Sequence, residues 1–193
     1  MKYEDIEQFI PGGGYQVNVP LGHIEATLTD FAQTKGDNLH GLDLDPDFQR
    51  DHVWTEDKQR AYVEFLLRGG QSSRTLHFNC PGWMASFKGP LQLVDGKQRL
   101  EAVRKFLRNE LRILAKPCGD IFATSGVILG DFSFEDQRII LRRHTLIFAV
   151  NNLPTRAEVL KWYLQLNTGG VVHTEEEIAK VQRMLNEERE CQN

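Results

Sequence analysis

Cysteine is scarce in this chain, and long apolar runs are missing from it. Only three cysteines occur among 193 residues, at Cys80, Cys118 and Cys191. An odd number of widely spaced cysteines argues against a disulfide framework and favours a reducing compartment. No apolar run approaches the roughly 20 residues that a membrane-spanning helix needs. Residues 1–5 include acids where a signal peptide is basic and then apolar. We therefore expect a cytoplasmic protein without a membrane segment.

An excess of positive charge is also missing, because the formal net charge is −4. A protein that coats nucleic acid through charge alone is disfavoured on this ground. Basic residues nevertheless gather at 97–112 and at 138–144, whereas 175–177 and 187–190 are acidic. Solvated helix faces would account for such clusters. Two basic stretches in an acidic protein also indicate a local anion site.

The composition, with 40% hydrophobic and 26% charged residues, is that of an ordinary globular domain. Residues 1–14 end in Pro-Gly-Gly-Gly, which breaks a helix, and we expect them to form a flexible arm. We expect residues 15–193 to form a single α+β domain. Strand patterns occur at 15–19, 42–45, 75–80, 91–94 and 145–150, the last taken as a central strand. Helical spacing occurs at 21–31, 55–68, 97–108 and 135–141, and residues 111–131 are expected to form strand fragments and turns.

The helix that begins after Thr55 is expected to be capped by that threonine, with acids in its first turn. Its buried face is predicted to carry Ala61, Tyr62, Phe65 and Leu66. The helix should end at the Gly-Gly pair of residues 69–70.

Two helices near the C-terminus each open with a capping box, Thr155 with Glu158 and Thr174 with Glu177. A turn at 167–170 would fold these helices into a hairpin. The residues expected to face the core are Val159, Trp162, Tyr163, Leu166, Ile178, Val181 and Leu185.

The most informative local pattern is a strand that leads directly into a helix at residues 91–100. The strand delivers Asp95 and Gly96 at its end, and Lys97, Gln98 and Arg99 would form the first helical turn. Helix N-termini bind phosphate or carboxylate because backbone N–H groups and the helix dipole point there. A simpler interpretation is that Asp95 only caps the helix.

A second polar segment, residues 45–54, lies between a strand and a helix. A loop that contains glutamine, arginine, histidine and tryptophan is either tightly packed or binds something. Within it, Arg50 has a planar guanidinium suited to phosphate or carboxylate. Gln49 precedes Arg50, as Gln98 precedes Arg99, and Trp54 is expected to belong to the core.

Three ordered motifs together resemble a known family. They are Phe48-Gln49-Arg50 followed by Trp54, then Val94-Asp95-Gly96-Lys97-Gln98-Arg99-Leu100, then Leu166-Asn167-Thr168-Gly169-Gly170 before Thr174. Across residues 20–185 the chain is similar to the N-terminal domain of the GmrSD-type restriction family, which has a ParB/sulfiredoxin-like fold. The resemblance implies a mixed sheet with nucleotide or phosphodiester chemistry at an Asp-Gly-x-Gln-Arg turn, in DNA restriction or counter-defence.

The resemblance places Asp95, Gly96, Gln98 and Arg99 on the core motif of the family, and Gln49 and Arg50 on an earlier motif. Family members commonly have glutamine where this chain has Lys97. The multidomain relatives also carry a His-Asn-His-type nuclease region, which this sequence does not contain, so cleavage by such a region is not expected.

These patterns lead to a main hypothesis of a nucleotide- or phosphate-binding domain, with slow hydrolysis of a nucleoside triphosphate as one form of it. Arg50, Lys97 and Arg99 would hold phosphate, while Gln49 and Gln98 would orient it or a water molecule. Asp95 would position a metal ion or a proton. Mg²⁺ bridging a nucleotide to Asp95 or Asp47 is the expected metal, since Mg²⁺ uses one or two carboxylates plus phosphates. No organic cofactor is expected.

Two alternatives stay open. The same cleft would suit a DNA phosphodiester in a DNA-binding or DNA-nicking domain. Alternatively, the chain is a non-catalytic module that retains the fold and docks a protein partner through the hairpin at Trp162 and Tyr163 or through its acidic end. Other sites are not indicated, because zinc spacing and a P-loop are missing from the sequence. A calcium loop starting at Asp43 would need glycine and glutamate where Phe48 and Trp54 stand.

Overall fold

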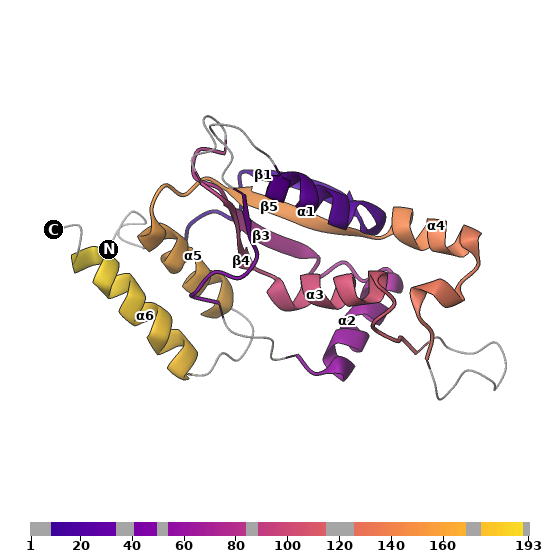
Figure 1. Ribbon diagram of the computed structural model, residues 1–193. Helices are drawn as coiled ribbons and strands as arrows, with labels where there is room; N and C mark the ends of the chain where they lie inside the picture. Colours follow the sequence, from indigo (N-terminus) through magenta and orange to yellow (C-terminus); the bar gives the residue numbers. More distant parts are fainter. Residues whose placement is uncertain are drawn as a thin grey trace, which may run out of the picture.

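A computed structural model describes residues 9–33, 41–49, 54–83, 89–114, 126–168 and 175–190 (Figure 1). The strands are β1 (Tyr15–Pro20), β2 (Leu42–Asp43), β3 (Thr75–Asn79), β4 (Leu91–Asp95) and β5 (Thr145–Asn151). The helices are η2 (Leu21–His23), α1 (Ile24–Gln33), α2 (Glu56–Leu67), α3 (Lys97–Leu107), η3 (Leu129–Asp131), α4 (Phe134–Arg143), α5 (Arg156–Thr168) and α6 (Glu175–Glu190). The predicted α+β class is confirmed.

The five strands form one mixed sheet in the order β1-β5-β3-β4-β2. β5 pairs with β1 in antiparallel and with β3 in parallel orientation. β3 and β4 are antiparallel, whereas β4 and β2 are parallel. β5 therefore lies inside the sheet, as predicted, and β3 occupies the middle position.

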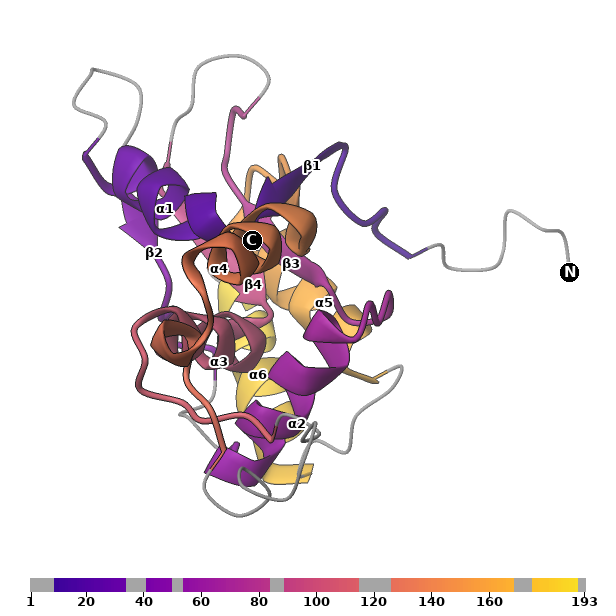
Figure 2. The same ribbon diagram turned by 90° about the vertical axis from the view of Figure 1, so that its right-hand side faces the viewer.

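Two apolar clusters hold helices onto the sheet. The larger cluster joins β3, β4 and β5 to α1, α2 and α3 through residues such as Phe78, Val103 and Phe148. The smaller cluster contains Val94 of β4, Phe48 and the facing sides of α5 and α6. α6 and α4 lie at opposite ends of the molecule (Figure 1), and in the view turned by 90° α4 faces the viewer while α6 lies behind it (Figure 2).

The C-terminal helices pack against each other, as predicted for a helical hairpin. Thr155 and Glu158 form the expected capping box, with the Thr155 N–H and hydroxyl both donating to Oε2 of Glu158 at 3.2 and 2.7 Å. Val159, Trp162 and Tyr163 are buried, and so are Val181 and Leu185 of α6, whereas Leu166 and Ile178 are half-buried. The second predicted capping box includes Thr174, which lies outside the described residues.

The predicted buried face of α2 is partly wrong. Thr55 caps the helix as expected, accepting a hydrogen bond from the N–H of Lys58 at 3.4 Å. Tyr62 is buried, but Ala61 and Phe65 are exposed. Their places are taken by the buried residues Gln59 and Val63. The buried positions on α2 are Gln59, Tyr62, Val63 and Leu66, which follow the helical repeat.

A polar residue occupies this buried face because its hydrogen bonds are satisfied there. The side-chain amide of Gln59 donates to the Trp54 carbonyl at 3.2 Å, and its oxygen accepts from Nζ of Lys105 at 3.2 Å. Buried polar groups are tolerated when they are paired in this way. A prediction from apolar periodicity does not place glutamine on a buried helix face. It therefore favoured the neighbouring face, which carries Ala61 and Phe65.

The first described residues are attached to α5 and to the end of β5. The Ile10 N–H donates to Gln165 Oε1 at 3.0 Å, and the Pro11 carbonyl accepts from Asn151 at 2.9 Å. Among the residues that the structure describes, no helix is both long and apolar enough to cross a membrane.

Candidate functional site

A one-residue irregularity between β3 and β4 determines where Asp95 points. Phe78 pairs with Leu93, but the next residue back along β3, His77, pairs with Asp95, so Val94 is an extra residue on β4. Strict alternation would place Asp95 on the same face as Leu93, towards α1–α3. The bulge instead brings Asp95 beside His77, whose Nδ1 lies 3.4 Å from Asp95 Oδ2. Bulges commonly re-aim side chains next to functional sites.

The backbone at Gly96 requires glycine for two independent reasons. Its φ of 110° lies in a region that L side chains rarely adopt. An added Cβ would also lie 2.5 Å from Cδ2 of Leu76 on β3. Gly96 is the N-cap of α3 and has no side chain to cap that helix. The strand-to-helix turn is therefore tight, and the first turn of α3 opens directly beside Asp95.

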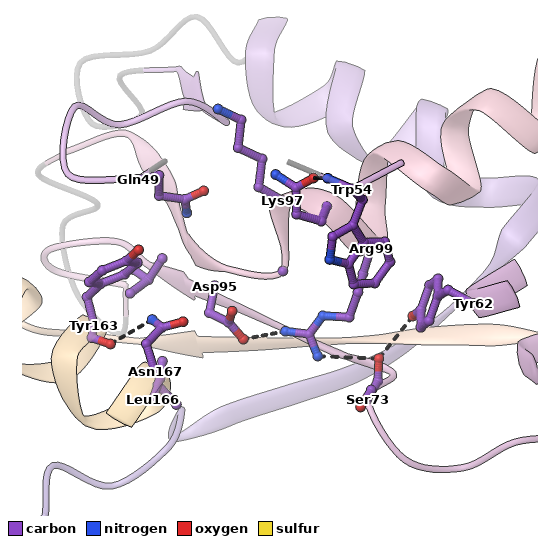
Figure 3. Close-up of a pocket in the computed structure, with 13 residues that line it drawn as sticks. Gln49, Trp54, Tyr62, Ser73, Asp95, Lys97, Arg99, Tyr163, Leu166 and Asn167 are labelled. Atoms are coloured by element: carbon purple, nitrogen blue, oxygen red, sulfur yellow. Dashed lines mark hydrogen bonds and ion pairs between the residues drawn. The ribbon is translucent and has the colours of Figure 1, made fainter. Parts of the chain in front are cut away.

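Arg99 connects Asp95 to the α2 side of the site (Figure 3). Its Nη2 donates to Oδ2 of Asp95, and its Nη1 donates to the Ser73 carbonyl at 3.3 Å. The same carbonyl accepts from the hydroxyl of Tyr62 at 2.9 Å. Ser73 has a positive φ of 57°, which is uncommon for serine. The arginine predicted to hold a ligand is thus already braced by an acid and a carbonyl.

The carboxyl of Asp95 is held in its ionised form. Burial by itself would raise the pKa of Asp95, but the hydrogen bond with His77 and the charge of Arg99 outweigh it, so the pKa lies below its usual range. A general base works best when its pKa is near the working pH. Asp95 is therefore better suited to positioning a cation than to accepting a proton.

Burial raises the pKa of Tyr62 to about 12, against the opposing charges of Arg99 and Arg74. Tyr62 consequently remains a neutral phenol that donates to Ser73. It acts as a fixed hydrogen-bond donor in the site wall.

The two glutamines predicted as catalytic both hold the backbone of the other segment. Gln49 Nε2 donates to the carbonyl of Leu93 on β4. Gln98 is buried, and its Oε1 accepts from the N–H of Trp54 at 3.1 Å. These bonds link Gln49 to β4 and Trp54 to α3. In this arrangement both amides shape the site, and Gln49 and Gln98 also line its wall.

The residues described so far surround one cavity of about 320 Å³. It is called the β4–α3 cavity below, and the residues that line it are Gln49, Trp54, Tyr62, Ser73, Val94, Asp95, Gly96, Lys97, Gln98, Arg99, Tyr163, Leu166 and Asn167. The third motif takes part through Leu166 and Asn167 at the end of α5, and the Asn167 amide donates to the Tyr163 carbonyl at 2.7 Å. All three motifs, although far apart in the sequence, thus meet at one place.

The lining of the β4–α3 cavity combines aromatic and cationic side chains. Trp54, Tyr62 and Tyr163 supply aromatic surface, and Trp54 packs edge-to-face on Tyr62 with ring centroids 5.6 Å apart. Lys97 and Arg99 supply positive charge at the start of α3. Trp54 was expected to belong to the core, and it does pack against the larger apolar cluster. It also lines the cavity, which was not expected.

Lys97 lines the cavity and also pairs with the segment that follows β2. Its Nζ donates to Asp45, whose side chain is 73% exposed, whereas that of Lys97 is only 11% exposed. An ion pair with so exposed an acid contributes little to stability and is easily exchanged for another anion.

Asp47, the second predicted Mg²⁺ ligand, lies apart from this arrangement. Its carboxylate pairs with Arg156 at 2.8 Å, and its carbonyl accepts from Lys180 at 2.9 Å. It does not line the β4–α3 cavity. Within the described ranges no group of three or more His, Cys, Asp or Glu side chains is arranged to hold a metal ion. Arg50 lies outside the described residues, while Gln49, which precedes it in the sequence, is on the cavity wall.

His77 is one of the site residues that the sequence did not indicate. It stands in the middle of a strand, where a lone histidine has no distinctive signal. Its ring also contacts Trp162 edge-on, at 5.6 Å between centroids. Ser73 was likewise not predicted, and Tyr163 was expected in the core or on a partner-docking surface, whereas both line the β4–α3 cavity.

In comparisons with known proteins, no family model, no curated protein and no solved structure matches this chain.

Proposed function

We propose that the chain binds a nucleotide in the β4–α3 cavity, with the phosphates at the start of α3. One observation carries this proposal: three separate segments converge on one cavity whose lining combines two cations with three aromatic rings. Ligand sites are typically concave, largely apolar and fitted with a few convergent polar groups. The cavity volume of about 320 Å³ is at the lower end of the usual range.

The phosphate end is supported by charge and by helix geometry. The first turn of α3 begins at Gly96 without a capping side chain, and helix N-termini favour anions. The ion-pair partner of Lys97 described above is an exposed acid, so a phosphate can replace Asp45 in that pair. Arg99 is fixed in place by Asp95 and Ser73, and its charge is preorganised rather than mobile.

The base end is supported by the aromatic walls. Trp54 and Tyr163 present rings to the cavity, and stacking on aromatic rings is worth roughly 1–3 kcal/mol per base. The requirement that both ends be satisfied at once favours a nucleotide over inorganic phosphate.

An ionised Asp95 beside a phosphate requires an additional positive charge. Arg99 supplies one such charge, and a Mg²⁺ ion bridging Asp95 to the phosphates would supply another, because Mg²⁺ needs only one or two carboxylates plus phosphates. We therefore propose that nucleotide binding depends on Mg²⁺ and that, of the two predicted metal ligands, only Asp95 would hold the ion. The resemblance described above adds DNA restriction or counter-defence as the proposed setting.

The proposal is tested by isothermal titration calorimetry with each nucleoside triphosphate and with a short DNA, with and without Mg²⁺. A nucleoside triphosphate with Mg²⁺ should bind and should raise the melting temperature, because a ligand selective for the native state stabilises it. Lys97→Ala should weaken binding by about tenfold or more, the value of one charge-assisted hydrogen bond. Lys58→Ala is the matched control, since Lys58 is exposed on α2 and does not line the cavity.

Arg50→Ala extends the same test to the residue outside the described ranges. If Arg50 serves the ligand, this variant should lose binding while its melting temperature stays nearly unchanged. Arg99→Ala is less informative, because loss of the Asp95 partner would also destabilise the fold. Release of phosphate from a bound triphosphate, measured separately, would distinguish hydrolysis from binding.

Binding of DNA with no response to any nucleoside triphosphate at millimolar concentration would replace this proposal with the phosphodiester alternative. A lack of response to both ligands would favour a non-catalytic interaction module.

A further inference from the structure

A second cavity lies at the C-terminal ends of α2 and α4, and three basic side chains are part of its lining. It has a volume of about 240 Å³, and its walls include Gly69, Gly70, Arg74, Arg143, His144 and Thr145. We call it the α2–α4 pocket. Figure 1 shows α2, α4 and the start of β5 on the same side of the molecule. Among the residues that the structure describes, none with an acidic side chain lines this pocket.

Arg74 is an incompletely compensated cation at the base of this pocket. Its Nη1 donates to the hydroxyl of Thr145 at 3.1 Å, whereas its Nε is buried and has no hydrogen-bond partner among the described residues. Salt bridges join many other arginines to acids, but in the described part of the chain none joins Arg74 or Arg143 to a carboxylate. Charged groups that are partly removed from water are normally paired.

The cations lie close enough to influence one another. The pKa of His144 is lowered by its burial first, and then by the charges of Arg143 and Arg74. Arg74 and Arg143, from two segments, therefore share one electropositive space with the His144 ring, which favours its neutral form there. Such a cluster is unfavourable unless an anion joins it.

The helix ends compensate this charge only in part. The C-terminal ends of α2 and α4 each contribute roughly half a negative charge. Together they offset about one of the two guanidinium charges. About one positive charge is left for a ligand, and an oxyanion that accepts several hydrogen bonds matches the planar donors of arginine.

From these observations we infer that the α2–α4 pocket binds a phosphate group, held by Arg74 and Arg143. The pocket is separate from the β4–α3 cavity, although the two are adjacent through the backbone: Ser73 lines the first cavity described and Arg74 lines the second. Phosphate binding here does not depend on nucleotide binding in the β4–α3 cavity.

The experiment uses inorganic phosphate as the probe, with binding followed by calorimetry and by the amide resonances of Gly69 and Gly70. Arg143→Gln should weaken phosphate binding by about tenfold, corresponding to one charge-assisted hydrogen bond. Arg143 is exposed, so this variant should fold normally. Arg142→Gln is the matched control, because it removes the same charge from the preceding position of α4, which does not line the pocket.

Failure of this inference and failure of the proposed function can be told apart. Phosphate binding at Gly69 and Gly70 should persist in Lys97→Ala, and nucleotide binding should persist in Arg143→Gln. Equal losses in Arg142→Gln and Arg143→Gln would show diffuse attraction to a basic helix and overturn the inference. Absence of any phosphate-dependent shift at Gly69 and Gly70 would overturn it as well.

A short oligonucleotide distinguishes two sources of the phosphate group. If the natural ligand is a nucleic-acid backbone, the oligonucleotide should bind more tightly than inorganic phosphate and be weakened by Arg143→Gln. If the ligand is free phosphate, the oligonucleotide should compete no better than phosphate does.

Discussion

At the scale of single residues, Asp95 owes its position to a bulge and its charge to its neighbours. His77 and Arg99 both contact Oδ2, and together they hold the pKa of Asp95 below its usual range despite burial. A carboxyl with a lowered pKa in the native state binds fewer protons there than in the unfolded state. Its contribution to stability is therefore present above the unfolded pKa and is lost as the pH falls through the folded pKa.

Asp95→Asn should accordingly destabilise the protein at pH 7 by about 1.5–3 kcal/mol, the usual value of hydrogen bonds to charged groups. The difference from the unsubstituted protein should begin to shrink below about pH 4, where the carboxyl of the unfolded chain begins to protonate, and should vanish once the pH falls below the lower pKa of the native carboxyl. Denaturant unfolding at both pH values measures this. Asp45→Asn, at an exposed acid, should show little effect, and a pH-independent loss in Asp95→Asn would refute the ionised, ion-paired assignment.

Gly96 provides a second prediction at this scale. Gly96→Ala should cost at least about 2 kcal/mol, because it combines a strained φ with overlap against Leu76. Gly41→Ala separates these two effects, since Gly41 has a φ of 92° but open space around its Cβ position. That variant should cost only about 1 kcal/mol. Equal melting temperatures of the two variants would contradict the close approach of β3 to Gly96.

At the scale of elements, α5 closes the site side of the sheet. Trp162 is 1% exposed and contacts His77, while Tyr163, next to it, lines the β4–α3 cavity. α5 thus belongs both to the smaller apolar cluster and to the site wall. Disturbing its packing should affect stability first and the site as a consequence.

Trp162→Ala is expected to lower the free energy of unfolding by about 3–5 kcal/mol, as for other large-to-small changes in a core. Phe134→Ala, at a residue that is 74% exposed on α4, should change it by no more than about 0.5 kcal/mol. Chemical denaturation of both variants provides the comparison. If Trp162→Ala melted normally and failed to bind a protein partner instead, the interaction-module alternative would gain support.

At the scale of the whole molecule, the structure separates the two basic stretches that look alike in sequence. In the first stretch, Arg104 of α3 and Arg108 just after it share Glu25, at 2.7 and 3.3 Å, and Arg99 pairs with Asp95, so much of the charge there is already paired with acids. On α4, Arg138 and Arg142 line an exposed surface and form no ion pair among the described residues. Any attraction to nucleic acid in this acidic protein should therefore act through α4.

Binding of a short duplex DNA, if it occurs, should weaken as salt increases. Replacing Arg138 and Arg142 by glutamine should reduce the slope of log K against log salt by about one for each phosphate that is no longer neutralised. Arg108→Gln should leave the slope unchanged. Fluorescence anisotropy at several salt concentrations measures this slope. An identical slope in the unsubstituted protein, the Arg138/Arg142 double variant and Arg108→Gln would exclude α4 as the DNA-binding surface.

Much of the element structure could be predicted from the sequence because its determinants are local. Thr55 caps α2, Thr155 and Glu158 form a capping box, and the Asp95-Gly96 pair marks a strand-to-helix turn. Such signals involve residues within about four positions of one another. Both polar segments contain a Gln-Arg pair next to a strand end, and this shared pattern indicated that they belong to one cleft. The structure places Gln49 and residues 95–99 around one cavity.

The tertiary structure decided the features that depend on distant partners. Gln59 is buried because Trp54 and Lys105 satisfy its amide, which no helical periodicity can indicate. His77 belongs to the site because an extra residue on β4 turns Asp95 towards it. The sequence by itself determined which residue types stand at the turns and strand ends. Which of those residues meet was decided by strand register and by hydrogen bonds between segments, since both join positions far apart in the chain.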